Sequence, residues 1–159
     1  HQLRNDPPGI AAQVLIGKAR TLSGLAQGLT AGVSKLAEEF WPGLLTFNLP
    51  QNQSLSWDLG DGGHLKNFAV RMPNQIQTLE VLNATGPLAI ASATLAGEGS
   101  IRTAMNPHDL ELLDIGELES GPLSTVVVQT GEKLLLSRVG AITLEDLRKV
   151  DSAIELAKE

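Results

Sequence analysis

The hydrophobic and polar positions along the chain follow two periods, and together they predict strands interleaved with helices. Short apolar runs bounded by Gly or Pro are typical of strands, whereas apolar residues three and four apart are typical of helices. The predicted strands are 10–17, 44–49, 67–72, 87–93, 112–118, 124–129 and 133–138, with 87–93 as a central strand. The predicted helices are 21–27, 30–40 and 75–82, another beginning at Asn106-Pro107 and a last one after Thr143, with 94–105 as a loop.

Local signals refine the ends of these elements. Thr130-Gly131-Glu132 between the last two strands is a hairpin signal. Asn74 is a predicted helix cap, as are Thr30 and Thr143, and Asp146 stands at the N3 position of the last helix. The apolar stripe of that helix is Leu144, Leu147, Val150 and Ile154. The pattern therefore predicts an α/β (α+β) fold, a sheet covered by helices with at least one antiparallel pair.

Composition narrows the class of protein. With 159 residues we expect a single domain over residues 1–159. Lys and Arg number 12 and Asp and Glu 18, so the net charge is −6, which excludes a generally basic nucleic-acid coat but not a local basic pocket. There is no Cys, and the aromatic residues are three Phe and two Trp, too few for a stacking platform for single strands. Since no apolar run reaches about 18 residues, we expect no membrane partner.

Common catalytic motifs are absent. His1, His64 and His108 lie far apart in the sequence and form no zinc-binding spacing. Neither a Walker A loop nor a G-x-G-x-x-G loop occurs, and Ser124 does not lie in a G-x-S-x-G motif. We therefore expect no resident metal and no catalytic nucleophile.

Polar side chains at the ends of apolar strand patterns are more informative. Arg71 and Arg138 each end an apolar run, Ser124 opens one, and Ser92 lies within another. Such residues are often only rim residues, but here several could converge on one rim of one sheet. Because Arg offers a planar fork of donors, this pattern predicts an anion or nucleotide site there.

The same segments resemble, in order, the YrdC/YciO family, whose best-known members are threonylcarbamoyl-AMP synthases. The matching segments are Phe40-Trp41-Pro42-Gly43-Leu44-Leu45-Thr46, Ala69-Val70-Arg71-Met72-Pro73, Gly86-Pro87-Leu88-Ala89-Ile90-Ala91-Ser92-Ala93, Ser124-Thr125-Val126-Val127 and Leu136-Ser137-Arg138-Val139-Gly140-Ala141-Ile142. The resemblance implies a twisted mixed sheet with helices on both faces. It also implies a cytoplasmic nucleotidyltransferase that joins L-threonine, bicarbonate and ATP, the last with or without Mg²⁺, for the t6A modification of tRNA. No tightly bound cofactor is implied, and binding of double-stranded RNA or tRNA is ascribed to the family.

Carried over by position, the resemblance assigns two groups of residues. Those on the threonine side are Arg71, Ser92 and Ser124, and those on the ATP or phosphate side are Arg4, Asn67, Thr94 and Arg138.

Departures from the family pattern leave the activity open. Gln2 stands in place of a lysine, Thr94 in place of an asparagine, Asn67 in place of a threonine and Val128 in place of an acidic residue. The family's N-terminal P-T-D/E-T-x-Y-G-L motif does not occur either, so we expect that part of the family domain to be absent. One hypothesis is a diverged or impaired synthase. The alternatives are a non-catalytic module that binds a nucleotide, an anion or double-stranded RNA, and a scaffold with a vestigial cavity.

Overall fold

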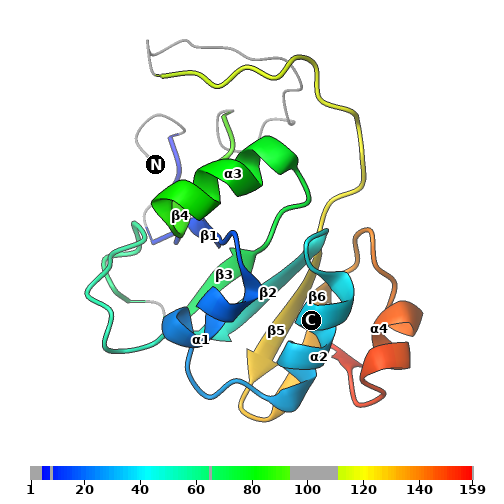
Figure 1. Cartoon of the computed structure of the whole chain (residues 1–159). Coiled ribbons are helices and arrows are strands. Elements are labelled where there is room, and N and C mark those ends of the chain that lie inside the picture. Colours follow the sequence, from blue (N-terminus) through cyan, green and yellow to red (C-terminus); the bar gives the residue numbers. More distant parts are fainter. Residues whose placement is uncertain (1–4, 8, 65, 94–110, 159) are drawn as a thin grey trace.

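Seven strands form one mixed sheet in the part of the chain that the structure describes (Figure 1). The structure is a computed structural model, and it describes residues 5–7, 9–64, 66–93 and 111–158. The strands are β1 (Gln13–Leu15), β2 (Leu45–Pro50), β3 (Asn67–Arg71), β4 (Leu88–Ile90), β5 (Thr125–Thr130), β6 (Lys133–Arg138) and β7 (Glu155–Leu156). The helices are α1 (Leu22–Leu25), α2 (Ala31–Phe40), α3 (Ile76–Thr85) and α4 (Leu144–Val150), with a 3₁₀ turn at Ala19–Thr21.

Strand directions bring the ends of two strands and the starts of two others together at one end of the sheet. The spatial order is β4-β1-β3-β2-β5-β6-β7. β2 is antiparallel to β3 and parallel to β5, while β6 is antiparallel to β5. Strands β3 and β6 therefore end where β2 and β5 begin. We call this end of the sheet the rim.

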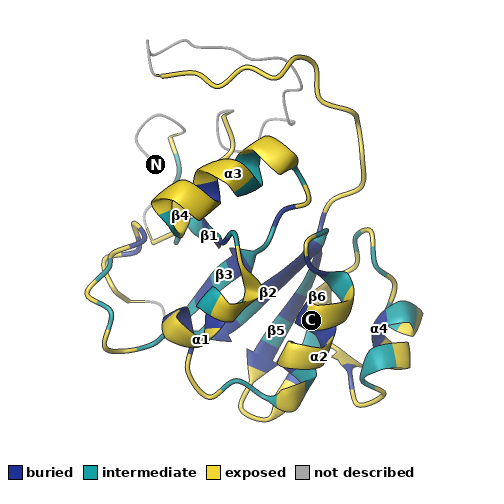
Figure 2. Ribbon diagram, in the orientation of Figure 1, coloured by how far each residue is buried: buried dark blue, intermediate teal, exposed yellow. Residues whose placement is uncertain are grey.

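Burial alternates along the strands, so the two faces of the sheet differ (Figure 2). Leu45, Phe47 and Val70 have no exposed surface, and they lie on the face that α1, α2 and α4 cover. Leu36 and Leu147 complete this core from α2 and α4. We call it the core face, and the opposite one the second face.

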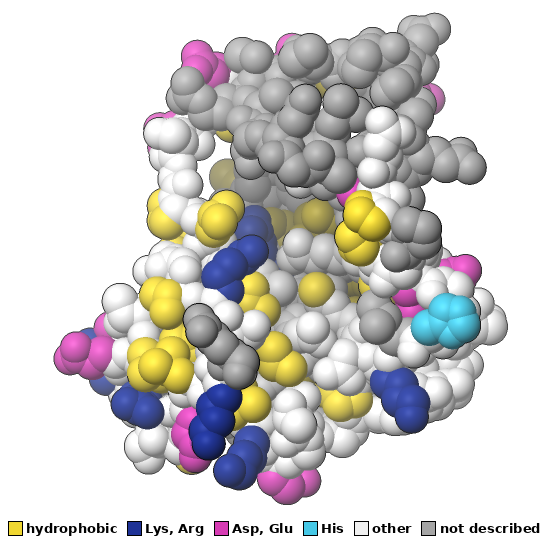
Figure 3. Space-filling model, turned by 180° about the vertical axis from the view of Figure 1, so that it is seen from behind, with side chains coloured by type: hydrophobic (Ala, Val, Ile, Leu, Met, Phe, Trp, Pro, Cys, Tyr) yellow, Lys and Arg dark blue, Asp and Glu magenta, His cyan; other side chains and the backbone are white. Residues whose placement is uncertain are grey.

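The second face is only partly buried. Its residues on β3 are Asn67, Ala69 and Arg71, all of intermediate exposure, and those on β5 are Val126 and Val128. Viewed from the side opposite to that of Figure 1, the molecule is hollowed, with basic and apolar side chains along the hollow (Figure 3).

The predicted fold class is confirmed, but several predicted elements are wrong in detail. Residues 112–118 form no strand, because the described chain offers this segment no strand partner for its backbone; Leu112 and Leu118 are about half exposed there. The predicted central strand 87–93 is β4, which pairs only with β1 and lies at an edge of the sheet among the described strands. The predicted loop 94–105 and the helix start at Asn106-Pro107 lie outside the described residues.

Two helix ends also differ from prediction. Gln75 rather than Asn74 caps α3, because the Gln75 side chain accepts a hydrogen bond from the Thr78 amide at 2.6 Å. Helix α4 ends at Val150, since Asp151 is extended, so Ile154 is not part of the helix. Ile154 is nevertheless fully buried, and its carbonyl accepts a hydrogen bond from Arg148 Nε at 2.9 Å.

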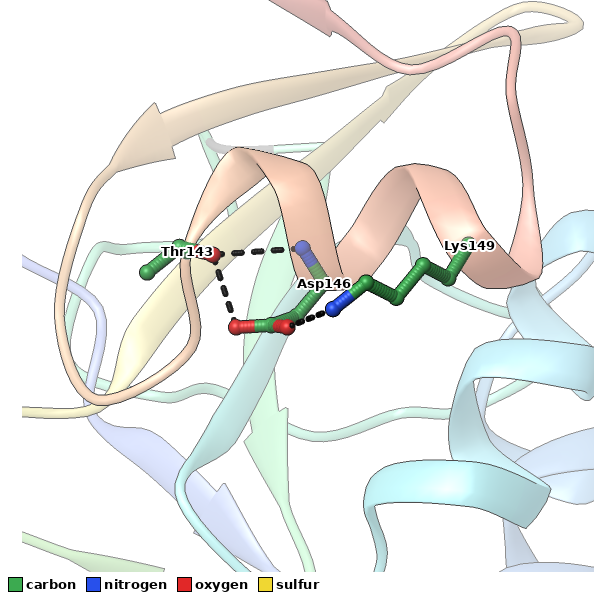
Figure 4. Close-up of polar contacts among 3 residues, drawn as sticks. All are labelled: Thr143, Asp146 and Lys149. Carbon is green, nitrogen blue, oxygen red and sulfur yellow. Dashed lines mark hydrogen bonds and ion pairs between the residues drawn. The ribbon is translucent and has the colours of Figure 1, made fainter.

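The predicted cap of α4 is confirmed (Figure 4). Thr143 Oγ1 accepts a hydrogen bond from the Asp146 amide at 3.2 Å and donates one to Asp146 Oδ2 at 2.7 Å. Lys149 Nζ lies 2.8 Å from Asp146 Oδ1. The hydrogen bond from Lys149, followed by that from Thr143, lowers the pKa of Asp146 to about 2.

The lowered pKa of Asp146 gives a pH-dependent stability. In the unfolded chain an Asp has a pKa near 3.9, so the cap contributes fully above about pH 4 and is lost as the pH falls toward 2. We expect Asp146→Asn to lower the melting temperature at pH 7 and the gap to wild type to close between about pH 4 and 2. Thermal unfolding across this range measures the gap. Glu145→Gln, which removes a carboxylate from the same turn but not the cap, is the control, and a pH-independent gap would contradict the cap's contribution.

Candidate functional site

Four polar side chains lie on the second face at the rim. Arg71 ends β3, Arg138 ends β6, Thr46 lies at the start of β2, and Ser124 immediately precedes β5. The register of the strands aligns Arg71, Thr46 and Arg138 in one row. Val126 pairs with both Thr46 and Arg138. Phe47 pairs with Val70, so the next pair along these two strands places Thr46 opposite Arg71. Three strand spacings separate Arg71 from Arg138, about 14 Å between Cα atoms. Two arginine side chains can reach a common ligand across that span.

Ser124 is the centre of a hydrogen-bonded cluster. Arg138 donates to the Ser124 carbonyl from Nε at 3.1 Å and from one terminal nitrogen at 2.8 Å, and that nitrogen lies 3.0 Å from Ser124 Oγ. Thr46 Oγ1 donates to Ser124 Oγ at 2.9 Å. Thr46 and Ser124 are both buried. The guanidinium of Arg138 is therefore held in one orientation, although the residue itself is exposed.

The segment after β6 is tied against this cluster. Thr125 Oγ1 accepts hydrogen bonds from the amides of Gly140 and Ile142 at 3.0 and 2.9 Å and donates to the Ile142 carbonyl at 2.7 Å. The Ala141 amide donates to the Leu123 carbonyl at 2.9 Å. These contacts fix the backbone from which Ser124 projects.

Arg71 differs from Arg138 because a buried part of its guanidinium has no partner. Its Nε is buried without a hydrogen bond, and no described carboxylate forms an ion pair with it. Burial lowers the pKa of Arg71 below its ordinary value. Even so, an arginine at neutral pH remains charged. A half-buried cation with an unused donor is costly on its own, and an anion bound at the rim would offset that cost.

The other predicted site residues do not gather at the rim. Asn67 begins β3, four residues and about 13 Å along the strand from Arg71. Ser92 is exposed and follows β4, which runs away from the rim, so it lies toward the same end as Asn67. The structure thus separates Ser92 from Arg71 and Ser124, the other two residues assigned to the threonine side. Arg4 and Thr94 lie outside the described residues.

Two residues of the second face were missed as site candidates. Thr46 bonds Ser124, and Asn48, two residues further along β2, has a buried Oδ1 without a partner. The signal is present in the sequence, because polar residues alternate with Leu45, Phe47 and Leu49 in this strand. Alternation of this kind marks the face that the core does not use.

Two features bear on other classes of site. Among the described residues, no three His, Asp or Glu side chains come together in a group that could hold a metal ion. No described helix is both long enough and apolar enough to span a membrane.

The close packing of Gly140 gives a test of the rim. A Cβ on Gly140 would lie 2.3 Å from the Leu123 carbonyl oxygen and 2.6 Å from the Ser124 carbonyl carbon. Backbone cannot move aside as a side chain does, so we expect Gly140→Ala to destabilise the fold by about 1–3 kcal/mol or more. Urea unfolding measures this. Gly121→Ala is the matched control, because no atom lies within 4 Å of its Cβ position. Equal stability of the two variants would be inconsistent with the packing described.

Comparison with known protein families gives the class of the protein. A sequence model of the Sua5/YciO/YrdC family, described as telomere recombination, matches residues 2–140. The chain belongs to this family, so the resemblance seen in the sequence is confirmed.

Relatives with known names and structures agree. A Mycobacterium tuberculosis protein is 33% identical over 143 residues, covering 86% of this chain and 65% of the relative. The threonylcarbamoyl-AMP synthase of Pyrococcus abyssi is 31% identical over 148 residues, covering 89% of this chain and 43% of the relative. The chain thus spans less than two thirds of the length of these proteins.

Solved structures of members of this family have the same fold. P. abyssi Sua5, in a crystal structure with L-threonine, matches with a TM-score of 0.85 at 29% identity, covering 98% of this chain and 47% of that one. Escherichia coli YciO matches with a TM-score of 0.69 at 18% identity, covering 92% of this chain and 73% of that one, and supports the fold alone.

Proposed function

We propose that this chain carries the substrate-binding sheet of a threonylcarbamoyl-AMP synthase, which uses L-threonine, bicarbonate and ATP. The observation that carries the proposal is the half-buried guanidinium of Arg71, whose Nε has no partner in the described chain, on the same row as the anchored Arg138. Two cations in one row of the second face suit a reaction whose substrates all carry a carboxylate, phosphates or another negative charge. Names of relatives over most of the chain support the same activity.

In the proposed reaction the amine of threonine combines with bicarbonate to give a carbamate and water. A carbamate oxygen then attacks the α-phosphorus of ATP, the bond to the β-phosphate oxygen breaks, and pyrophosphate leaves. No covalent enzyme intermediate is needed, so the protein's contribution is positioning and charge stabilisation. Any Mg²⁺ would enter with ATP as part of the substrate. The product would serve tRNA modification in the cytoplasm.

Roles follow from position on the second face. Arg71 is proposed to hold the carboxylate of threonine, and Ser124, whose hydroxyl accepts a hydrogen bond from Thr46, lies two strands away at the same rim. Arg138 is proposed to contact phosphate with the guanidinium nitrogen that Ser124 does not bond. Asn67, at the far end of the same face, is proposed to lie on the nucleotide side. Arg4, Thr94 and Ser92 are retained as proposed ligand contacts on the family resemblance alone.

A non-catalytic binding module is the second candidate. One observation favours it, because Nε and one terminal nitrogen of Arg138 are already bonded to the Ser124 carbonyl, which leaves less of the guanidinium for phosphate. Such a module would bind a nucleotide, another anion or double-stranded RNA without turnover. Affinity for RNA would fall steeply with salt.

Release of pyrophosphate decides between the two candidates. We expect release that requires ATP, L-threonine and bicarbonate together, with each omitted in turn as a control. Binding without release would favour the binding module.

Arg71→Ala tests the residue that carries the proposal. A charge-assisted hydrogen bond contributes about 1.5–3 kcal/mol, so affinity for L-threonine should fall roughly tenfold to a hundredfold or more. Arg71→Lys should recover only part, because lysine keeps the charge but lacks the planar fork. Lys133→Ala is the matched control, since Lys133 begins β6 at the end away from the rim and its side chain is 71% exposed. Calorimetric titration measures these affinities. An affinity of Arg71→Ala for L-threonine equal to that of wild type would contradict the proposal.

A further inference from the structure

Asn48 is a polar residue whose place in the fold does not account for it. It lies in the middle of β2 on the second face, one row in from Thr46. Its neighbours across the sheet are Ala69 on β3 and Val128 on β5, and neither side chain can form a hydrogen bond. Its Oδ1 is buried and has no partner.

An unpartnered amide at this position is unfavourable for folding. A valine would fill a similar volume, suit a strand better and bury no polar group, because β-branched residues pack well on a pleated surface. Leaving a buried acceptor unsatisfied carries a desolvation cost. The described chain offers no compensating contact, and a bound molecule with a hydrogen-bond donor would supply one.

The position of Arg71, which also has an unpartnered polar atom, indicates which chemical groups such a molecule would carry. Arg71 Nε, a donor, is also buried without a partner. Arg71 lies on the neighbouring strand, diagonal to Asn48 on the same face, because Asn48 pairs with Ala69 two residues earlier. Diagonal neighbours in a sheet are about 7–8 Å apart. An unused acceptor and an unused donor thus lie within the reach of one small molecule.

We propose that Asn48 is a substrate-contacting residue, whose amide oxygen accepts a hydrogen bond from the amino group of the amino acid that Arg71 holds by its carboxylate. An α-amino acid carries a donor and an anionic acceptor on one carbon, which matches the two unpartnered groups. The inference rests on the proposed function, and it adds the recognition of the amino group. Asn48 therefore favours amino acids over other small carboxylates.

The test compares two ligands and a matched pair of variants by calorimetric titration. L-Threonine has the amino group, and 3-hydroxybutanoate keeps the carboxylate and the hydroxyl but lacks it. We expect Asn48→Val to weaken L-threonine binding by tenfold or more and to leave 3-hydroxybutanoate binding unchanged. The melting temperature should stay the same or rise. Asn48→Thr, which has the shape of Val with an acceptor hydroxyl, should recover part of the loss.

Gln13→Val is the control for loss of an amide from this face. Gln13 lies in the same row on β1, two strands and about 10 Å away, as the register of β1 and β3 continues. We expect this variant to bind both ligands as wild type does. An equal effect of Gln13→Val, an equal loss of both ligands in Asn48→Val, or a lower melting temperature would each overturn the inference.

The outcomes separate the inference from the proposed function. If wild type and Asn48→Val bind L-threonine equally while Arg71→Ala does not, Asn48 makes no such contact and the proposed function stands. If wild type binds no L-threonine, both are overturned.

Discussion

The direction of the strands beside β2 is the constraint on which the site depends. β2 has an antiparallel neighbour on one side and a parallel neighbour on the other, so the end of β3 and the starts of β2 and β5 meet at one rim. Leu45, Phe47 and Leu49 hold this register, because a shift by one residue would move all three out of the core. The same shift would turn Thr46 and Asn48 into it. Core packing therefore fixes which polar groups lie on the second face.

The two arginines at the rim differ in how their guanidinium groups are hydrogen-bonded. The charge of Arg138 is partly satisfied by the Ser124 carbonyl, so its orientation is set before any ligand arrives. Arg71 lacks such a contact in the described chain and keeps a buried donor unused. The first is preorganised, and the second is costly until an anion binds. Together they give one fixed and one available cation across about 14 Å.

Much of this could be predicted from the sequence, because apolar period and strand-end polarity are local properties. The hairpin of β5 and β6, the cap of α4 and the place of Arg71, Ser124 and Arg138 at strand ends all follow from such local signals. The edge position of β4 could not be predicted, since an apolar run does not reveal how many strands pair with it. The irregular conformation of 112–118 was missed for the same reason. Asn48 was missed because alternation along β2 shows only which face a residue lies on, whereas its unpartnered amide oxygen is seen only in the structure.

Alternation along β2 has a consequence for how this protein can diverge. Residues of the core and residues of the second face are neighbours in sequence along β2 but lie on opposite faces of the sheet. A change at Asn48 removes no contact from the core beneath Phe47, whereas Thr46 is buried and donates a hydrogen bond to Ser124. A single substitution at Asn48 can thus change the chemistry of the second face without a compensating change in the core. Asn48 is for that reason a natural place to begin when changing which groups this face of the sheet presents.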